Sequence, residues 1–207
     1  PTLSDYFETP EEAVRHYGYL KQVYQSISAK EVYSSYVFPW DCVVLTRSDV
    51  VLKMAYIAWM TNDIRLREEL CTYLPALESY NRASYIGIVL ARTESKVEQE
   101  YVLQSLGDRS ADIRDEAYKV LSEMSLSPEQ YQHIEELLRF KYSEMRINAI
   151  NLLMKQPEAQ LAASIRRLLS DKNAERRLAG LDMMKSIRNV DFLKDSYQKL
   201  LSTVREI

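Results

Sequence analysis

A pattern that repeats at a nearly constant interval in the second half of the chain constrains the fold more than any other feature of this sequence. The pattern begins with two apolar residues spaced by four, and it recurs as Val102 and Leu106, Ile134 and Leu138, Ile165 and Leu169, and Tyr197 and Leu201. Successive copies lie 31 or 32 residues apart. A fixed period of this length is typical of repeat proteins, in which each unit buries its apolar surface against its neighbours. The sequence therefore predicts a stack of similar units.

A second pattern follows each of the first three apolar pairs and has the form Arg-x-x-Ala-x-x-x-Leu or Met. Its copies begin at Arg114, Arg146 and Arg176, and a degenerate copy with tyrosine in place of alanine begins at Arg82. Apolar residues that recur at spacings of three and four predict an amphipathic helix with one buried stripe. Each unit is thus expected to contain two helices.

Helix start signals support this two-helix unit. Capping boxes with proline at the first helical position begin at Thr9 and at Ser127, and Pro157 precedes another expected helix. Short polar turns at residues 107–110, 141–143 and 170–173 separate the two helices of a unit, because Ser, Asp and Asn can cap the next helix. Gly180 lies inside an expected helix, where a missing side chain permits close approach of a neighbouring helix.

Residues 1–62 follow the repeat poorly. A short helix is expected to begin at residues 28–31 and to end near Pro39, and another is expected over residues 48–60. We therefore predict a degenerate helical cap over residues 1–62 and repeats over residues 63–207, continuous with one another as a single domain.

The tryptophans of this cap allow two interpretations. Trp40 and Trp59, with the nearby aromatic residues Tyr36, Phe38 and Tyr56, could form a platform on which a nucleic-acid base stacks. Packing inside the cap is favoured, because Trp59 lies in an apolar helical run.

Glycine is scarce, and this excludes several enzyme classes. The chain has only 4 glycines, Gly18, Gly87, Gly107 and Gly180, and no two of them are close enough in sequence to share a motif. No Gly-rich dinucleotide or phosphate loop and no nucleophile elbow can be written with them. The 2 histidines, His16 and His133, lack metal-ligand spacing, so neither catalytic residues nor a cofactor or metal is predicted.

Charge and cysteine content indicate the environment of the protein. The net charge of -3 argues against a dedicated nucleic-acid binder, although residues 105–207 carry 17 basic and 16 acidic side chains. The 2 cysteines, Cys42 and Cys71, are typical of buried thiols in a reduced cytoplasmic protein. Stretches without charge reach nine residues, against the roughly 20 that a membrane helix needs, so no membrane segment is predicted.

The repeat resembles HEAT repeats. Asp108 with Arg114, and Asp171 with Arg176, follow the spacing of a turn aspartate and a helix arginine in that family, although Ala76 and Phe140 stand where aspartates would be expected. Residues 168–183 are also similar to helical-repeat regions of large bacterial proteins of unknown function. The resemblance implies an all-α fold, namely the α-α superhelix of a HEAT-like or armadillo-like solenoid.

Two sets of residues are candidates for function. In a stack of repeats, four arginines would form a row, namely Arg82, Arg114, Arg146 and Arg176. This row could bind phosphates or an acidic peptide. A structural role is favoured, in which the arginines pair with acids such as Asp108, Asp112, Glu144 or Asp171 and form a ladder between repeats. In HEAT-like stacks the second helix of each pair lines the concave face, which suggests partner-binding positions at Lys119, Asn151, Lys155, Arg177, Lys185 and Arg188.

These observations predict a non-enzymatic scaffold that binds a protein or peptide, either whole or as a segment of a larger protein. The alternative is a HEAT-like DNA-binding enzyme that resembles the alkylpurine DNA glycosylases. The negative net charge argues against that alternative, because neutralisation of phosphates drives such binding.

Overall fold

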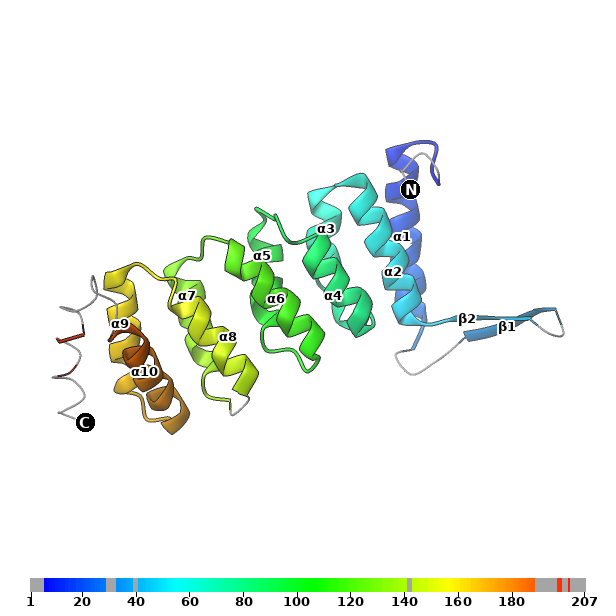
Figure 1. The fold of residues 1–207 in the computed structure, drawn as a ribbon. Coiled ribbons are helices and arrows are strands. Elements are labelled where there is room, and N and C mark those ends of the chain that lie inside the picture. The colour runs from blue at the N-terminus through cyan, green and yellow to red at the C-terminus, as the bar shows by residue number, and fades with distance from the viewer. Residues whose placement is uncertain are drawn as a thin grey trace. The chain divides into compact units, whose positions relative to one another are not determined.

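The computed structural model describes residues 6–28, 33–38, 41–140, 143–188, 197–198 and 201. These residues form ten α-helices, a short 3-10 helix and one β-hairpin (Figure 1). The predominantly helical class predicted from the sequence is confirmed. The chain divides into two compact units, Pro1–Val102 with Ser110–Glu116, and Leu103–Arg109 with Ala117–Ile207. The boundary expected after residue 62 stays a prediction.

The first unit is built around helix α2. Its elements are α1 (Pro10–Ser26), α2 (Arg47–Thr61), α3 (Ile64–Leu70), the 3-10 helix η2 (Leu74–Ala76), α4 (Ser79–Ile88) and most of α5 (Lys96–Ser105). Helix α2 contacts α1, α3 and η2, so it buries residues on more than one side, among them Val50, Met54 and Ile57. A capping box of Thr46 and Asp49 begins α2, since each side chain accepts a hydrogen bond from the other residue's backbone N–H.

The segment of chain that connects α1 to α2 contains a β-hairpin, which was not expected from the sequence. Strands β1 (Tyr33–Phe38) and β2 (Asp41–Leu45) pair in antiparallel fashion, with a bulge between Tyr36 and Phe38 (Figure 1). The short helix predicted to end near Pro39 is therefore wrong over Tyr33–Phe38. Both strands are rich in aromatic and β-branched residues, which favour strands and outweigh the helical pattern.

The second unit contains helices that pack in consecutive pairs. Its elements are the end of α6 (Ala111–Glu123), α7 (Pro128–Leu137), α8 (Ser143–Leu153), α9 (Glu158–Leu169) and α10 (Ala174–Ile187). Helix α7 contacts α8, and α9 contacts α10; in addition α7 contacts α9, and α8 contacts α10. Within this unit the first helices of two successive pairs therefore pack together, and so do the second helices.

The repeated apolar positions form the core, as the sequence predicts. The buried members are Val102, Leu106, Ala117, Leu121, Ile134, Leu138, Ala149, Leu153, Ile165, Leu169, Ala179 and Met183. The capping box of Ser127 and Gln130 begins α7, and Asn173 caps α10. A Cβ atom on Gly180 would lie 3.2 Å from the Cβ of Leu168, so the close helix approach expected there is confirmed.

Candidate functional site

Ion pairs join the first helices of successive pairs. Arg67 on α3 forms two hydrogen bonds with Glu98 on α5, from Nε to Oε1 at 2.8 Å and from Nη2 to Oε2 at 2.7 Å. Glu98 is 0 % exposed, and its carboxylate raises the pKa of the Arg67 guanidinium. Two charge-assisted bonds of this geometry satisfy a buried carboxylate.

An equivalent ion pair joins two first helices of the second unit, but there the acidic residue precedes the basic residue in the sequence. Glu135 on α7 is 2 % exposed and accepts a hydrogen bond from Nη2 of Arg167 on α9 at 2.6 Å. Lys21 on α1 likewise pairs with Glu69 on α3. Sequence analysis missed these pairs, although opposite charges 31 and 32 residues apart, one repeat period, are a signal that could have found two of them.

The arginine series also makes contacts between helices, mostly with partners that the sequence did not suggest. Arg146 on α8 pairs with Glu175 at 3.2 Å and Asp182 at 2.7 Å, both on α10. Arg176 pairs with Asp171 at 2.9 Å, which is the partner that the sequence spacing suggests.

The other two arginines of the series lie in the first unit. Arg82 on α4 donates a long hydrogen bond of 3.5 Å to the carbonyl oxygen of Pro75, and Arg114 on α6 is half-buried. The structural role of the whole series stays a prediction.

All six partner-binding candidates lie on second helices or at their ends. Five of them are exposed, namely Lys119, Asn151, Lys155, Lys185 and Arg188. Lys155 donates to the carbonyl oxygen of Ser122 at 2.6 Å. Arg177 differs from the others because it is half-buried and donates to two turn carbonyls, of Asp171 at 2.9 Å and Lys172 at 2.8 Å. Arg177 therefore holds the turn between α9 and α10.

Exposed apolar residues lie beside these candidates. Ile147 on α8, and Leu178 and Leu181 on α10, are exposed to solvent. Sequence analysis missed them because apolar residues in a helix are assigned to its buried stripe by default. The second helices of this unit thus combine lysines with apolar side chains.

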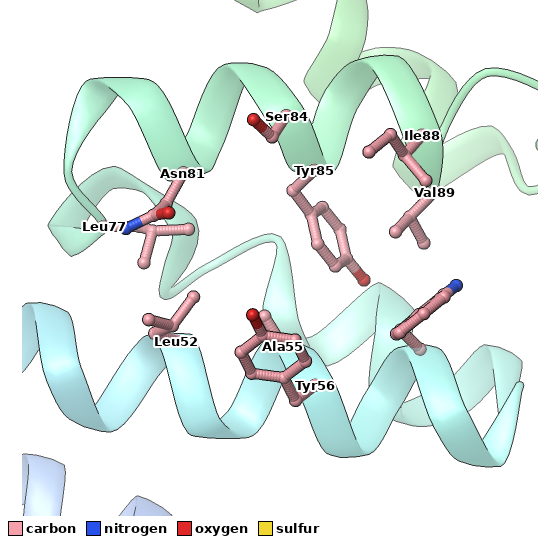
Figure 2. Close-up of a pocket in the computed structure, with 10 residues that line it drawn as sticks. Leu52, Ala55, Tyr56, Leu77, Asn81, Ser84, Tyr85, Ile88 and Val89 are labelled. Carbon is pink, nitrogen blue, oxygen red and sulfur yellow. The ribbon is translucent and has the colours of Figure 1, made fainter. Parts of the chain in front are cut away.

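A pocket of about 230 Å³ opens between the second helices α2 and α4 in the first unit (Figure 2). Figure 2 shows that α2 and α4 supply its two walls. The pocket is lined by Leu52, Ala55, Tyr56, Trp59, Leu77, Asn81, Ser84, Tyr85, Ile88 and Val89. None of these side chains carries a charge.

Large apolar side chains at this pocket are exposed. Tyr56 is 49 %, Trp59 43 % and Ile88 71 % exposed. The packing of Trp59 inside the cap, predicted from its apolar run, is therefore wrong. Because α2 is buried on several sides, the periodicity of its apolar residues did not reveal which of them faces outward. The side chains of Tyr36, Phe38 and Trp40, the other members of the suggested stacking platform, lie outside the described part of the structure.

Tyr85 lines this pocket with a side chain that is almost entirely buried. Its side chain extends from α4 into the space facing α2 (Figure 2), and the residue is only 7 % exposed. The hydroxyl oxygen is buried and has no hydrogen-bond partner among the described residues. Burial, reinforced by the carboxylate of Glu98, raises the pKa of Tyr85 above its ordinary value.

Metal-binding clusters and membrane-spanning helices are both missing from the described residues. Among these residues, no three side chains of His, Cys, Asp or Glu come together in a way that could hold a metal ion. No helix in this part of the chain has the length and apolar character needed to cross a membrane.

The described residues thus form a helical protein whose consecutive helix pairs share a repeated set of buried positions. Its second helices carry a pocket and exposed apolar residues. The chain belongs to a family of unknown function (DUF5724), whose model matches residues 2–207. No curated protein and no solved structure matches the chain.

Proposed function

We propose that this chain is a non-enzymatic scaffold of HEAT-like helical repeats that binds a protein or peptide partner on its second helices. The observation that carries this proposal is the pocket between α2 and α4, because Tyr56, Trp59 and Ile88 remain exposed around it. Large apolar groups that gather on a protein surface are typical of interaction sites. Aromatic side chains also contribute much of the binding energy at protein interfaces.

The packing of helices supports a HEAT-like superhelix. In the second unit, contacts of α7 with α9 and of α8 with α10 are those expected when helical pairs stack in the same orientation. Buried ion pairs between first helices, such as Arg67 with Glu98, join neighbouring pairs at the interval of the repeat. Within a stack of this kind the second helices lie on a common face that is available to a partner.

The second helices of the other unit carry a separate candidate surface, which is charged. Lys155 and exposed Lys185 belong to the same unit as exposed Leu178 and Leu181, which suits a partner segment that combines acidic and apolar residues. Arg177 is left out of this surface, because its guanidinium binds the α9–α10 turn. The proposal includes the cytoplasmic location predicted from the cysteines.

Site-specific photo-crosslinking in the native host tests the proposal. A benzophenone amino acid replaces Ile88 on the second helix α4 in one variant and Tyr19, an exposed residue of the first helix α1, in the control variant. We expect a discrete protein adduct from position 88 and none from position 19, and the purified partner is then expected to bind the wild-type chain. Equal adducts from both positions, or none from position 88, would refute the assignment of the binding surface.

The separate charged surface on α8 and α10 has its own test. Reversal of charge at Lys155 and Lys185 is expected to weaken binding of the same partner and to reduce its dependence on salt. Binding that is unchanged would remove α8 and α10 from the proposed surface. If the chain instead binds duplex DNA with a steep dependence on salt, the DNA-binding alternative replaces the scaffold.

A further inference from the structure

We infer, on the basis of the proposed scaffold function, that the exposed face of α8 and α10 binds a helix of the partner that runs antiparallel to both. The partner helix carries acidic residues in its first turn and apolar residues about two turns later. The exposed face in question, called the α8–α10 face below, consists of Ile147, Lys155, Leu178, Leu181, Lys185 and Arg188.

The apolar residues of the α8–α10 face lie at one level of the two helices. Ile147 on α8 is 57 % exposed, and Leu178 and Leu181 on α10 are 46 % and 39 % exposed. Arg146, next to Ile147, pairs with two acids of α10 that lie three residues before and four residues after Leu178. These ion pairs place Ile147 and Leu178 at the same level, toward the N-terminal ends of α8 and α10.

Basic residues occupy the other end of the same face. Lys155 and Lys185 lie nine residues after Arg146 and Arg176, so they hold equivalent positions in successive repeats. Arg188, about one turn beyond Lys185, is also exposed. Neither Lys185 nor Arg188 forms an ion pair with another residue that the structure describes. A partner that covers this end is therefore best complemented with carboxylates.

The distance between the two ends sets the spacing of the partner's residues. Leu178 and Lys185 lie on one stripe of α10, because they are seven residues apart in a helix that turns about every 3.6 residues. At a rise of about 1.5 Å per residue, this separation is about 10 Å along the helix. A partner helix laid along α8 and α10 spans it with about seven residues, whereas an extended segment needs about three. Recognition of a helix through positions i, i+4 and i+7 fits this face.

Helix dipoles set the direction of the partner. Helices α8 and α10 contact each other, and Figure 1 shows them running in the same direction. Their C-terminal ends therefore lie together and carry the partial negative charge of two dipoles. The positive N-terminal end of a partner helix is favoured there. Acidic residues are in turn favoured in the first turn of a helix, where they would also face Lys155 and Lys185.

Photo-crosslinking from two positions of α10 in the native host tests the spacing and the direction. A benzophenone amino acid replaces Leu178 in one variant of the full chain, Lys185 in a second, and exposed Gln132 of the first helix α7 in the control. Mass spectrometry of the adducts identifies the partner residues. We expect both α10 positions to attach to one segment of a single protein, and position 132 to give no adduct. The site from position 185 is expected beside an Asp or Glu, about seven residues before the site from position 178.

Binding of a synthetic peptide that spans this segment tests the charges. Lys185→Glu is expected to weaken its binding about fivefold, and lysine in place of the facing acidic residue of the peptide is expected to restore it. Lys172→Glu makes the same change of charge in the turn between α9 and α10, outside the α8–α10 face, and is expected to change the affinity less than about twofold. Equal losses in the two variants would overturn the role of Lys185.

The outcomes separate this inference from the proposed function. Sites in the reverse order, a separation of about three residues, or adducts with lipid or nucleic acid would each overturn the inference. An adduct from position 88 with none from positions 178 and 185 would leave the scaffold in place and remove the α8–α10 face. The absence of adducts from all three positions would refute the proposed function as well.

Discussion

Replacement of Tyr85 by phenylalanine removes a buried hydroxyl that has no hydrogen-bond partner in the described part of the chain, and it is expected to stabilise the protein. In the unfolded chain that hydroxyl is hydrated, whereas burial without a partner costs the native state about 1–3 kcal/mol. Removal of the oxygen also forfeits dispersion contacts of about 0.1–0.2 kcal/mol each, which offsets a few tenths. We therefore expect the free energy of unfolding to rise by about 1 kcal/mol at pH 7.

Tyr17 provides the matched control within the same unit. Its buried hydroxyl donates to the carbonyl oxygen of Leu66 at 3.2 Å. Tyr17→Phe removes this bond and is expected to lower the free energy of unfolding by about 1 kcal/mol. The same chemical change thus has opposite signs at the two positions, and the difference of about 2 kcal/mol rests on hydrogen bonding.

Urea unfolding followed by far-ultraviolet circular dichroism measures both effects. The midpoint is expected to rise for Tyr85→Phe and to fall for Tyr17→Phe, with the dependence on urea unchanged. In thermal unfolding, each kcal/mol corresponds to a shift of about 2–4 °C in Tm for a chain of this size. If Tyr85→Phe destabilises the protein as much as Tyr17→Phe does, the Tyr85 hydroxyl has a partner in the native state and the reasoning is refuted.

Two further predictions concern buried charge and alkaline pH. Arg67→Ala leaves the buried carboxylate of Glu98 without its partner and is expected to cost about 3–5 kcal/mol in urea unfolding, whereas Arg67→Met combined with Glu98→Leu restores most of that loss. Arg65→Ala, which removes an exposed pair with Asp63, is expected to leave the urea midpoint almost unchanged; a similar loss for both arginines would contradict the role of burial. Burial raises the pKa of the Cys71 thiol from 9.0 to about 12, so the unfolded chain loses this proton first. The contribution of this thiol to the free energy of unfolding is complete below pH 9 and declines as pH rises toward 12, by up to about 1.4 kcal/mol per pH unit. Cys71→Ala is therefore expected to flatten the decline in the free energy of unfolding measured between pH 8 and pH 10.

The sequence predicted the repeated core because burial imposes a period. Val102, Ile134 and Ile165 occupy equivalent buried positions in successive repeats, so the same position stays apolar in each copy. The hairpin was missed because an apolar, aromatic-rich run of this length suits a strand as well as a helix. Only pairing with a second segment decides between them.

The candidate site was predicted in outline but not in its residues. The sequence directed attention to second helices, and the pocket lies between two of them. Trp59 was missed because contacts on several sides of α2 make its exposed and buried apolar residues look alike in sequence. Arg67 and Glu135 were missed because the basic residue comes first in one ion pair and second in the other, so the charges do not repeat in phase.

The buried pair of Arg67 and Glu98 also fixes the register of α3 relative to α5. The two side chains must lie at the same level along the packed helices α3 and α5, although 31 residues separate them in the sequence. One extra residue inside α4, or a slip of α5 by a single turn, would withdraw the guanidinium and leave the carboxylate in the interior. Changes of length between the two helices can therefore be absorbed only in turns that leave the register of α3 with α5 intact.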